Sequence, residues 1–368
     1  ILGIGLGSAL ATWRADLRRA AVVPAAMGLA GVGAVVLVAV AVLTASVNLE
    51  PLVFALATLP YLFVGVALAV IFSVASDDSP RLYMADLIGA GAGAVLAIPL
   101  LNAFGALNGA LLAAALLSLG GVIWRWRSFA PALLAITSAV LVSNLALEWL
   151  ALDMGDLHTG KPIESSLAGD GQIIATEWDS FARTDLVDPG DGRPYELYVD
   201  GAAGSVMPPA GVEQMLLGDI GFFPFATMQP ERVLVIGPGG GLDVWFGLQS
   251  GASEIVAVEV NPASVDLVRE YADYNGDLYG QPTVRVEVDE GRSVLLRENR
   301  DYDLIFLSQV ITSTAERSGY VLSENTIYTV EAFSDYLDHL RLVVQLERNL
   351  PAGPQVIEVV AERFDGVD

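Results

Sequence analysis

Five long apolar runs fill most of the first 150 residues of this 368-residue chain, and they restrict its fold more than any other feature. They cover about 22–47, 51–75, 84–104, 106–124 and 128–149. A helix needs about 20 apolar residues to cross the hydrocarbon core of a bilayer, and each run has about that length. Because buried helices of a soluble protein do not follow one another in this way, we predict a multi-pass α-helical membrane domain in a lipid bilayer.

The chain opens inside a further apolar stretch. Residues 1–12 are typical of the end of another membrane helix, and Ile1 stands within an apolar run rather than on a methionine. We therefore expect further residues before Ile1 in the natural protein.

Basic residues of the first half occur only in alternate connections between the apolar runs. They are Arg14, Arg18, Arg19, Arg81, Arg125 and Arg127. The positive-inside rule places these connections in the cytoplasm. If 128–149 crosses the membrane, the second half of the chain emerges on the other side; if that run is interfacial or re-entrant, the second half stays in the cytoplasm. We predict an integral protein of a bacterial inner membrane, with both orientations open.

The second half of the chain is strongly acidic. Of the chain's 19 basic and 43 acidic residues, six of each lie in 1–150, which leaves 13 basic and 37 acidic residues for the rest. Such a surface repels phosphate backbones, which argues against nucleic acid as a partner, and attracts a small cationic substrate. With no cysteine and only two histidines, disulfides and thiol nucleophiles are excluded, and no metal site is predicted.

A glycine turn between two short apolar strands dominates the second half. Val233–Ile236 predicts a buried parallel strand, Gly237–Gly241 a turn nearly without side chains, and Asp243 the cap or first turn of a helix. A second strand follows over 255–260, with Glu259 near its end. These are the parts of a nucleotide-binding βαβ unit. The spacing is G-x-G-x-G, since the third glycine of a dinucleotide fingerprint would fall on Leu242, and it is more typical of proteins that bind S-adenosylmethionine.

Strands and helices alternate through the rest of the chain. Short strands over 170–205 predict a small β region, and strands near 283–288 and 303–307 alternate with helices near 262–274, 291–298 and 329–340. This order predicts a doubly wound parallel sheet. We expect a membrane domain over 1–150, a linker and small β region over 151–210, and a Rossmann-like nucleoside-binding domain over 211–368.

From about Gln172 to Leu340 the chain resembles the spermidine synthase (polyamine aminopropyltransferase) family, and most of all a bacterial branch fused behind membrane helices. The matching segments are Trp178–Arg183, Tyr198–Gly201, the glycine turn, Val258–Pro262, Asp289–Arg292, Tyr302–Ile305 and Leu322–Asn325 with Tyr328. The resemblance implies a class I methyltransferase-type fold and S-adenosylmethionine or its decarboxylated form as the ligand. The cofactor-binding residues it implies are Gly237, Gly239, Gly241, Glu259, Asp289 and Glu290.

The chain departs from the family where the chemistry takes place. The family's aspartate in the glycine turn is Gly240 here, its catalytic aspartate is Ser308, and its glutamine after the Asp-Gly turn is Gly204. Serine is a poor base, so standard aminopropyl transfer is doubtful. Methyl transfer needs less assistance, although methyltransferases place an acid at the position of Val235. The catalytic candidates, all in a long segment after a strand, are Ser308, Gln309 and Tyr328.

Three functions follow from these observations. The first is a membrane-anchored transferase that uses S-adenosylmethionine or its decarboxylated form. The second is a catalytically inactive relative, a scaffold that binds membrane-protein partners or further copies of itself. The third is an NAD-linked oxidoreductase, against which Leu242 argues.

Overall fold

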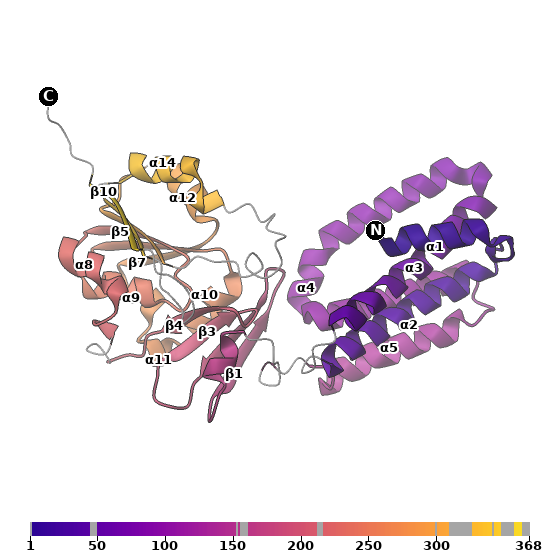
Figure 1. Ribbon diagram of the computed structural model, residues 1–368, viewed down its shortest axis with the longest axis horizontal. Helices are drawn as coiled ribbons and strands as arrows, with labels where there is room; N and C mark the ends of the chain where they lie inside the picture. The colour runs from indigo at the N-terminus through magenta and orange to yellow at the C-terminus, as the bar shows by residue number, and fades with distance from the viewer. Residues whose placement is uncertain are drawn as a thin grey trace. The chain divides into compact units, whose positions relative to one another are not determined.

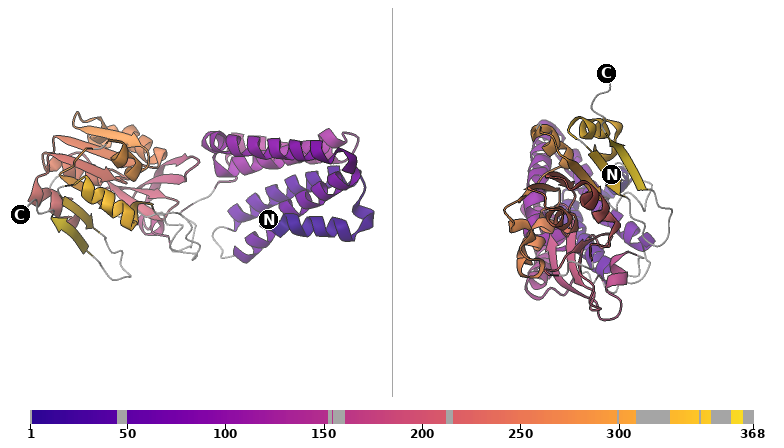
Figure 2. Two further views of the ribbon diagram at one scale, coloured as in Figure 1. Left: turned by 90° about the horizontal axis from the view of Figure 1, so that it is seen from above. Right: turned by 90° about the vertical axis from the view of Figure 1, so that its left-hand side faces the viewer.

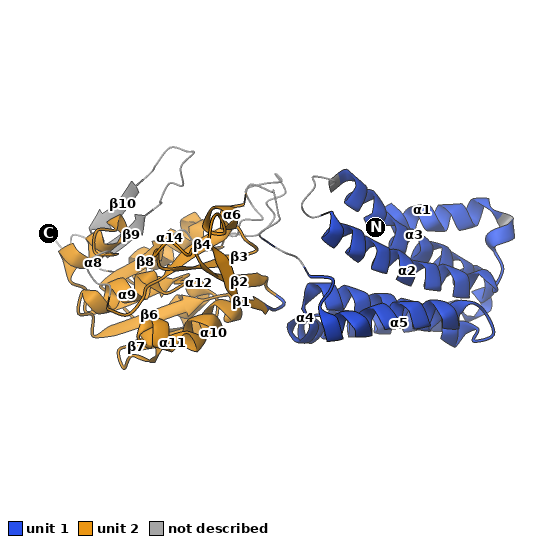
Figure 3. Ribbon diagram, turned by 90° about the horizontal axis from the view of Figure 1, so that it is seen from below, with its two compact units in different colours: residues 1–160, 178–180 blue, residues 161–177, 181–368 orange. Residues whose placement is uncertain are grey.

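The computed structural model of the protein divides into two compact units (Figures 1 and 2). It describes residues 2–44, 50–151, 154, 161–211, 216–298, 300–308, 326–340, 342–346 and 357–362. We call residues 1–160 with 178–180 the helical unit, and residues 161–177 with 181–368 the α/β unit (Figure 3).

The helical unit contains long apolar helices that lie side by side (Figure 2). They are α1 (Leu2–Trp13), α2 (Val22–Leu43), α3 (Glu50–Val74), α4 (Ser79–Trp124) and α5 (Ala130–Leu147). Among the residues that the structure describes, four helices are long and apolar enough to cross a membrane by length and composition. The two runs predicted at 84–104 and 106–124 both lie in α4, which is non-helical only at Gly105, with φ 68° and ψ 174°.

Glycines bring α1 and α3 into backbone contact. A Cβ on Gly3 would lie 2.7 Å from the carbonyl oxygen of Thr58, and one on Gly7 would overlap that of Leu62. Gly5 lies between these two residues and has no atom within 4 Å of such a Cβ. Small residues at a spacing of four allow this close approach of membrane helices.

The two ends of the helical unit differ in charge. At one end the Trp124 indole donates to the carbonyl of Ala20 at 3.0 Å, so the end of α4 meets the start of α2. All six basic residues predicted to share one face belong to the connections of this end, which we call the basic end. At the other end the Asn144 amide of α5 donates to Asn108 of α4 at 2.8 Å. The chain leaves the unit there.

The α/β unit begins with a four-stranded sheet. Its strands are β1 (Gln172–Trp178), β2 (Arg183–Asp188), β3 (Tyr195–Val199) and β4 (Ala203–Met207), in that order. The β2–β3 and β3–β4 pairs are antiparallel. Leu186, Leu197 and Met207 of this small sheet are buried in one core with side chains of the larger sheet that follows.

The larger sheet has six strands in the order β10-β9-β8-β5-β6-β7. They are β5 (Arg232–Ile236), β6 (Glu254–Glu259), β7 (Val284–Val288), β8 (Leu304–Ser308), β9 (Leu342–Leu346) and β10 (Ile357–Glu362). All neighbours are parallel except β9 and β10. The helices that follow β5, β6, β7 and β8 are α9 (Leu242–Gln249), α10 (Pro262–Glu270), α12 (Gly291–Glu298) and α14 (Val330–Asp338).

Both faces of this sheet are buried. Val233 and Val235 belong to one hydrophobic core, whereas Leu234 and Ile236 belong to a second one on the other face. Successive residues of a strand point to opposite faces, so continuous apolar runs suit strands covered by helices on both sides. The predicted Rossmann-like α/β sheet is thus confirmed.

Candidate functional site

The predicted site residues gather at the carboxyl end of the parallel strands. From β5 the chain winds outward to β6 and β7 and then returns to β8 on the other side of β5. Ligands of doubly wound sheets bind at such a switch point. Gly237, Glu259, Asp289 and Ser308 end or follow β5, β6, β7 and β8, four neighbouring strands.

The backbone N–H groups of the glycine loop are bound by acceptors of the protein itself. Gly237 donates to Val258 O at 2.9 Å and Gly241 to Pro238 O at 2.8 Å. Gly239 donates to Glu259 Oε2 at 3.0 Å, and Gly240 donates to Ser205 Oγ at 2.8 Å.

A dinucleotide pyrophosphate binds the free N–H groups of such a turn. None of the four glycine N–H groups is free here, which argues against the NAD-linked function. The loop needs glycine at Gly237, Gly239 and Gly241 because their φ angles are 71°, 51° and 95°.

Glu259 is a buried carboxylate at the centre of this edge. It is 6 % exposed, and it accepts N–H bonds from Gly239 and from Asn261, both at 3.0 Å. Burial raises the pKa of Glu259, and the backbone N–H groups partly offset that rise. A carboxylate has about four lone-pair sites, so Glu259 can accept further hydrogen bonds beside these two.

A second buried acid, Asp243, lies in the first turn of α9. The helix cap is Gly241, so of the two positions predicted for Asp243 the structure shows the first turn. Asp243 is 7 % exposed, and burial raises its pKa from 3.8 to about 8. Tyr279 is also buried, and its hydroxyl donates to Gly239 O at 3.3 Å.

Asp289 and Glu290 follow β7 but differ in their partners. Asp289 bonds through its backbone N–H to Glu259 O at 3.1 Å, and its carboxylate pairs with Arg297 at 2.7 Å. That guanidinium lowers the pKa of Asp289. Glu290 instead accepts the N–H groups of Arg292 at 3.0 Å and Ser293 at 2.7 Å, so it caps the start of α12.

At Gly240 and Gly204, two of the three positions where the sequence differs from spermidine synthases, neighbouring atoms lie where a side chain would begin. A Cβ on Gly240 would lie 2.6 Å from the carbonyl oxygen of Val206 in β4, and one on Gly204 would lie 2.6 Å from the Tyr198 ring. The side chains missing from these positions therefore leave no empty space. Ser308 ends β8 beside the glycine loop and is partly exposed.

The other two catalytic candidates are Tyr328 and Gln309. Tyr328 lies in a 3-10 turn, Thr326–Tyr328, and packs against the core under α14. Gln309 lies outside the described residues. No group of three or more His, Asp or Glu side chains that suits a metal ion occurs in the described ranges.

Sequence reasoning missed Ser205, Asn261 and Tyr279. Asn261 caps α10 and donates to Thr184 Oγ1 at 2.8 Å, which joins the small sheet to the strand end that carries Glu259. The Asn-Pro pair after β6 is a signal for the cap, but no local pattern shows that Ser205 and Tyr279 reach the glycine loop.

No protein-family model matches the chain, and no curated protein is similar to it. Among solved structures, the chain is similar to a spermidine synthase in complex with the transition-state analogue AdoDATO, with 18 % identity and a TM-score of 0.35. It is also similar to spermidine synthase from Thermotoga maritima, with 17 % identity and a TM-score of 0.35. Each match covers 48 % of this chain and 56 % or 55 % of the other, so the chain spans little more than half of those proteins.

Proposed function

We propose that the protein is a membrane-anchored, spermidine-synthase-like transferase that binds S-adenosylmethionine or decarboxylated S-adenosylmethionine. The observation that carries the proposal is the position of Glu259. This buried carboxylate is bonded to the glycine loop at a topological switch point, and Asp289 follows the next strand along the edge. Two acids in these places suit the ribose hydroxyls and the amine of an adenosyl group.

The residues of this edge fit an adenosyl ligand, and each has a separate task. Glu259 accepts the ribose hydroxyls, and Asp289 accepts the exocyclic amine of adenine. The glycine loop lets the ligand approach the backbone closely. When bound, a sulfonium of this type supplies an activated alkyl group to a nucleophile. Ser308 ends β8, which pairs with the strand before the glycine loop, and it can orient an acceptor by a hydrogen bond without acting as a strong base.

The anchor is the helical unit, which we place in a bacterial inner membrane. Its apolar helices have the required length and composition, and several expose large apolar side chains over their length. A row of such helices is unstable in water and stable in lipid.

A second candidate function, the inactive scaffold in a membrane assembly, is favoured by two observations. The first is chemical: Val206 fills the space beside Gly240, and serine ends β8, so neither family acid has a replacement at its own position. The second is topological, because the chain leaves the helical unit at the end opposite the basic end. If the basic end faces the cytoplasm, the α/β unit lies away from the compartment where adenosyl sulfoniums are made.

Calorimetric titration of the full chain in lipid nanodiscs tests the proposal. The ligands are S-adenosylmethionine, its decarboxylated form and methylthioadenosine. We expect micromolar binding that Glu259→Gln abolishes. Glu254→Gln is the matched control, because Glu254 starts the same strand at its opposite end. Absence of binding by the folded protein would overturn the proposal and leave the scaffold.

A further inference from the structure

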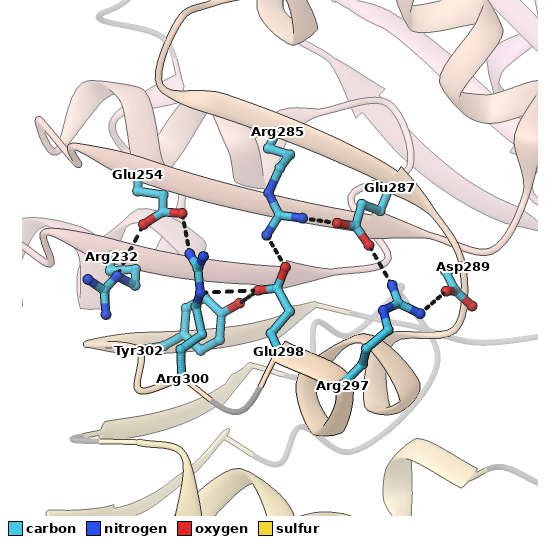
Figure 4. A network of polar contacts seen from close by, with 9 residues as sticks. All are labelled: Arg232, Glu254, Arg285, Glu287, Asp289, Arg297, Glu298, Arg300 and Tyr302. Carbon is cyan, nitrogen blue, oxygen red and sulfur yellow. Dashed lines mark hydrogen bonds and ion pairs between the residues drawn. The ribbon is translucent and has the colours of Figure 1, made fainter.

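A row of alternating charges leads along the α/β unit to Asp289 (Figure 4). Its members, in order of contact, are Glu254, Arg300, Glu298, Arg285, Glu287, Arg297 and Asp289. Arg297 stands at the site end of this row. Its Nη2 lies 2.8 Å from Glu287 Oε2, and its Nη1 lies 2.7 Å from Asp289 Oδ2.

Asp289 differs from the other two acids at this end of the row. Glu287 lies between Arg285 and Arg297, and Glu298 lies between Arg285 and Arg300, so each contacts two guanidinium groups. Asp289 contacts one guanidinium group among the described residues. Because Asp289 is the last acid of the row, its carboxylate can still accept a hydrogen bond at the place where Glu287 and Glu298 each bind a second guanidinium group.

Three bonds fix the place and direction of the Asp289 carboxylate. Its backbone N–H donates to Glu259 O at 3.1 Å, which ties it to the strand end that carries the other predicted ligand acid. Its Oδ1 accepts the N–H of Glu290 at 2.8 Å, and its Oδ2 accepts Arg297. Without Arg297, the N–H of Glu290 is the one donor left to this carboxylate among the described residues, and the side chain can rotate about its χ angles.

We propose that Arg297 is a positioning residue that aims the Asp289 carboxylate at the exocyclic amine of a bound purine, and so selects aminopurine ligands over purines that lack the amine. The inference rests on the proposed function, since it assigns specificity within the same site. An ionised carboxylate only accepts hydrogen bonds, so it rewards an N–H donor at this position. A carboxylate held in one direction makes a shorter and straighter bond than one that rotates.

The test compares two ligands that differ only in the amine: methylthioadenosine and its 6-deamino analogue, with purine in place of adenine. Both are titrated into the full chain in nanodiscs. The wild-type protein is expected to prefer the aminopurine by roughly tenfold or more, the value of one hydrogen bond to a charged group. In Arg297→Ala the preference falls to roughly threefold or less, while the affinity for the deamino analogue stays the same.

Two further variants complete the design. Asp289→Ala is expected to lose the preference to the same extent as Arg297→Ala. Arg300→Ala is the matched control, because Arg300 belongs to the same row but contacts Glu254 and Glu298 instead of Asp289. It is expected to keep the wild-type preference.

The outcomes separate the inference from the proposed function. If the wild-type protein binds neither ligand, the proposed function fails and the inference fails with it. If it prefers the aminopurine and Arg297→Ala keeps that preference, only the inference is overturned. An equal loss of affinity for both ligands in Arg297→Ala also overturns it, because that result assigns Arg297 to the fold rather than to selection.

Discussion

The carboxylate of Glu259 and the backbone N–H of Gly239 meet at 3.0 Å, so a buried acid and the glycine loop fix each other's position. The bond spans the switch point of the sheet, between the turn after β5 and the end of β6. For the ribose of the proposed ligand, both the acid and the loop are therefore already in place. Little conformational entropy is lost on binding at such a preorganised site.

The burial of Asp243 predicts a loss of stability with rising pH. Its pKa is about 8 in the folded protein and 3.8 without burial, so the folded state holds the proton more tightly. The contribution of the neutral carboxyl is complete below about pH 4 and is lost as the pH rises through the folded pKa. We expect Asp243→Asn to be more stable than the wild type by roughly 2–4 kcal/mol at pH 8.5.

Thermal unfolding of both proteins, followed by tryptophan fluorescence at pH 4.5 and pH 8.5, measures this effect. The advantage of Asp243→Asn is expected only at the higher pH. A constant difference between the two proteins would show that Asp243 does not titrate in this range.

The contact of β4 with the glycine loop predicts that Gly240→Ala is destabilising. The added Cβ would lie 2.6 Å from Val206 O and 2.7 Å from Val206 C, and backbone cannot rotate away as a side chain can. We expect a loss of roughly 1–3 kcal/mol, as for overpacked cores. Gly218→Ala serves as the control in the same unfolding assay, because a Cβ there meets nothing within 4 Å. Equal melting temperatures for the two variants would contradict the contact.

The backbone contact between α1 and α3 predicts different effects for two neighbouring glycines. Gly7→Ala places a Cβ on the Leu62 carbonyl. We expect it to lower the free energy of unfolding in detergent by roughly 1–3 kcal/mol, and the melting temperature with it. Gly5→Ala has open space and is expected to leave the melting temperature unchanged. The packing is wrong if the two variants melt alike.

The proposed membrane anchor predicts how the protein fractionates. With four helices of sufficient length and apolarity in its described part, the full chain is expected to stay in the membrane pellet after washing with alkaline carbonate and to enter solution only with detergent. Release by carbonate alone would show peripheral attachment and refute the proposed anchor.

The sequence predicted the features that depend on local pattern. The β-branched run 233–236 is β5, which begins one residue earlier, and the glycine turn, α9 and β6 follow as expected. The break between the runs 84–104 and 106–124 falls on Gly105. Glycine and β-branched residues act through their own backbone preferences, which neighbouring positions reveal.

The site features that the sequence did not predict depend on contacts between residues far apart in the chain. Ser205 bonds to Gly240 across 35 positions, and Tyr279 to Gly239 across 40. From the sequence, Asp243 is an ordinary acid in the first turn of a helix, and its burial is visible only in the folded structure. The sequence also did not predict the ion pair between Arg297 and Asp289, because Arg297 reaches Asp289 only once α12 folds back along β7.

The carbonyl of Val206 beside Gly240 also links the sequence of the glycine turn to that of β4. Any side chain at position 240 would begin 2.6 Å from this backbone oxygen, so a substitution there has to move β4 as well as the turn. A change in the glycine turn is therefore tolerated only together with a change in β4, and the two segments are expected to vary as a pair.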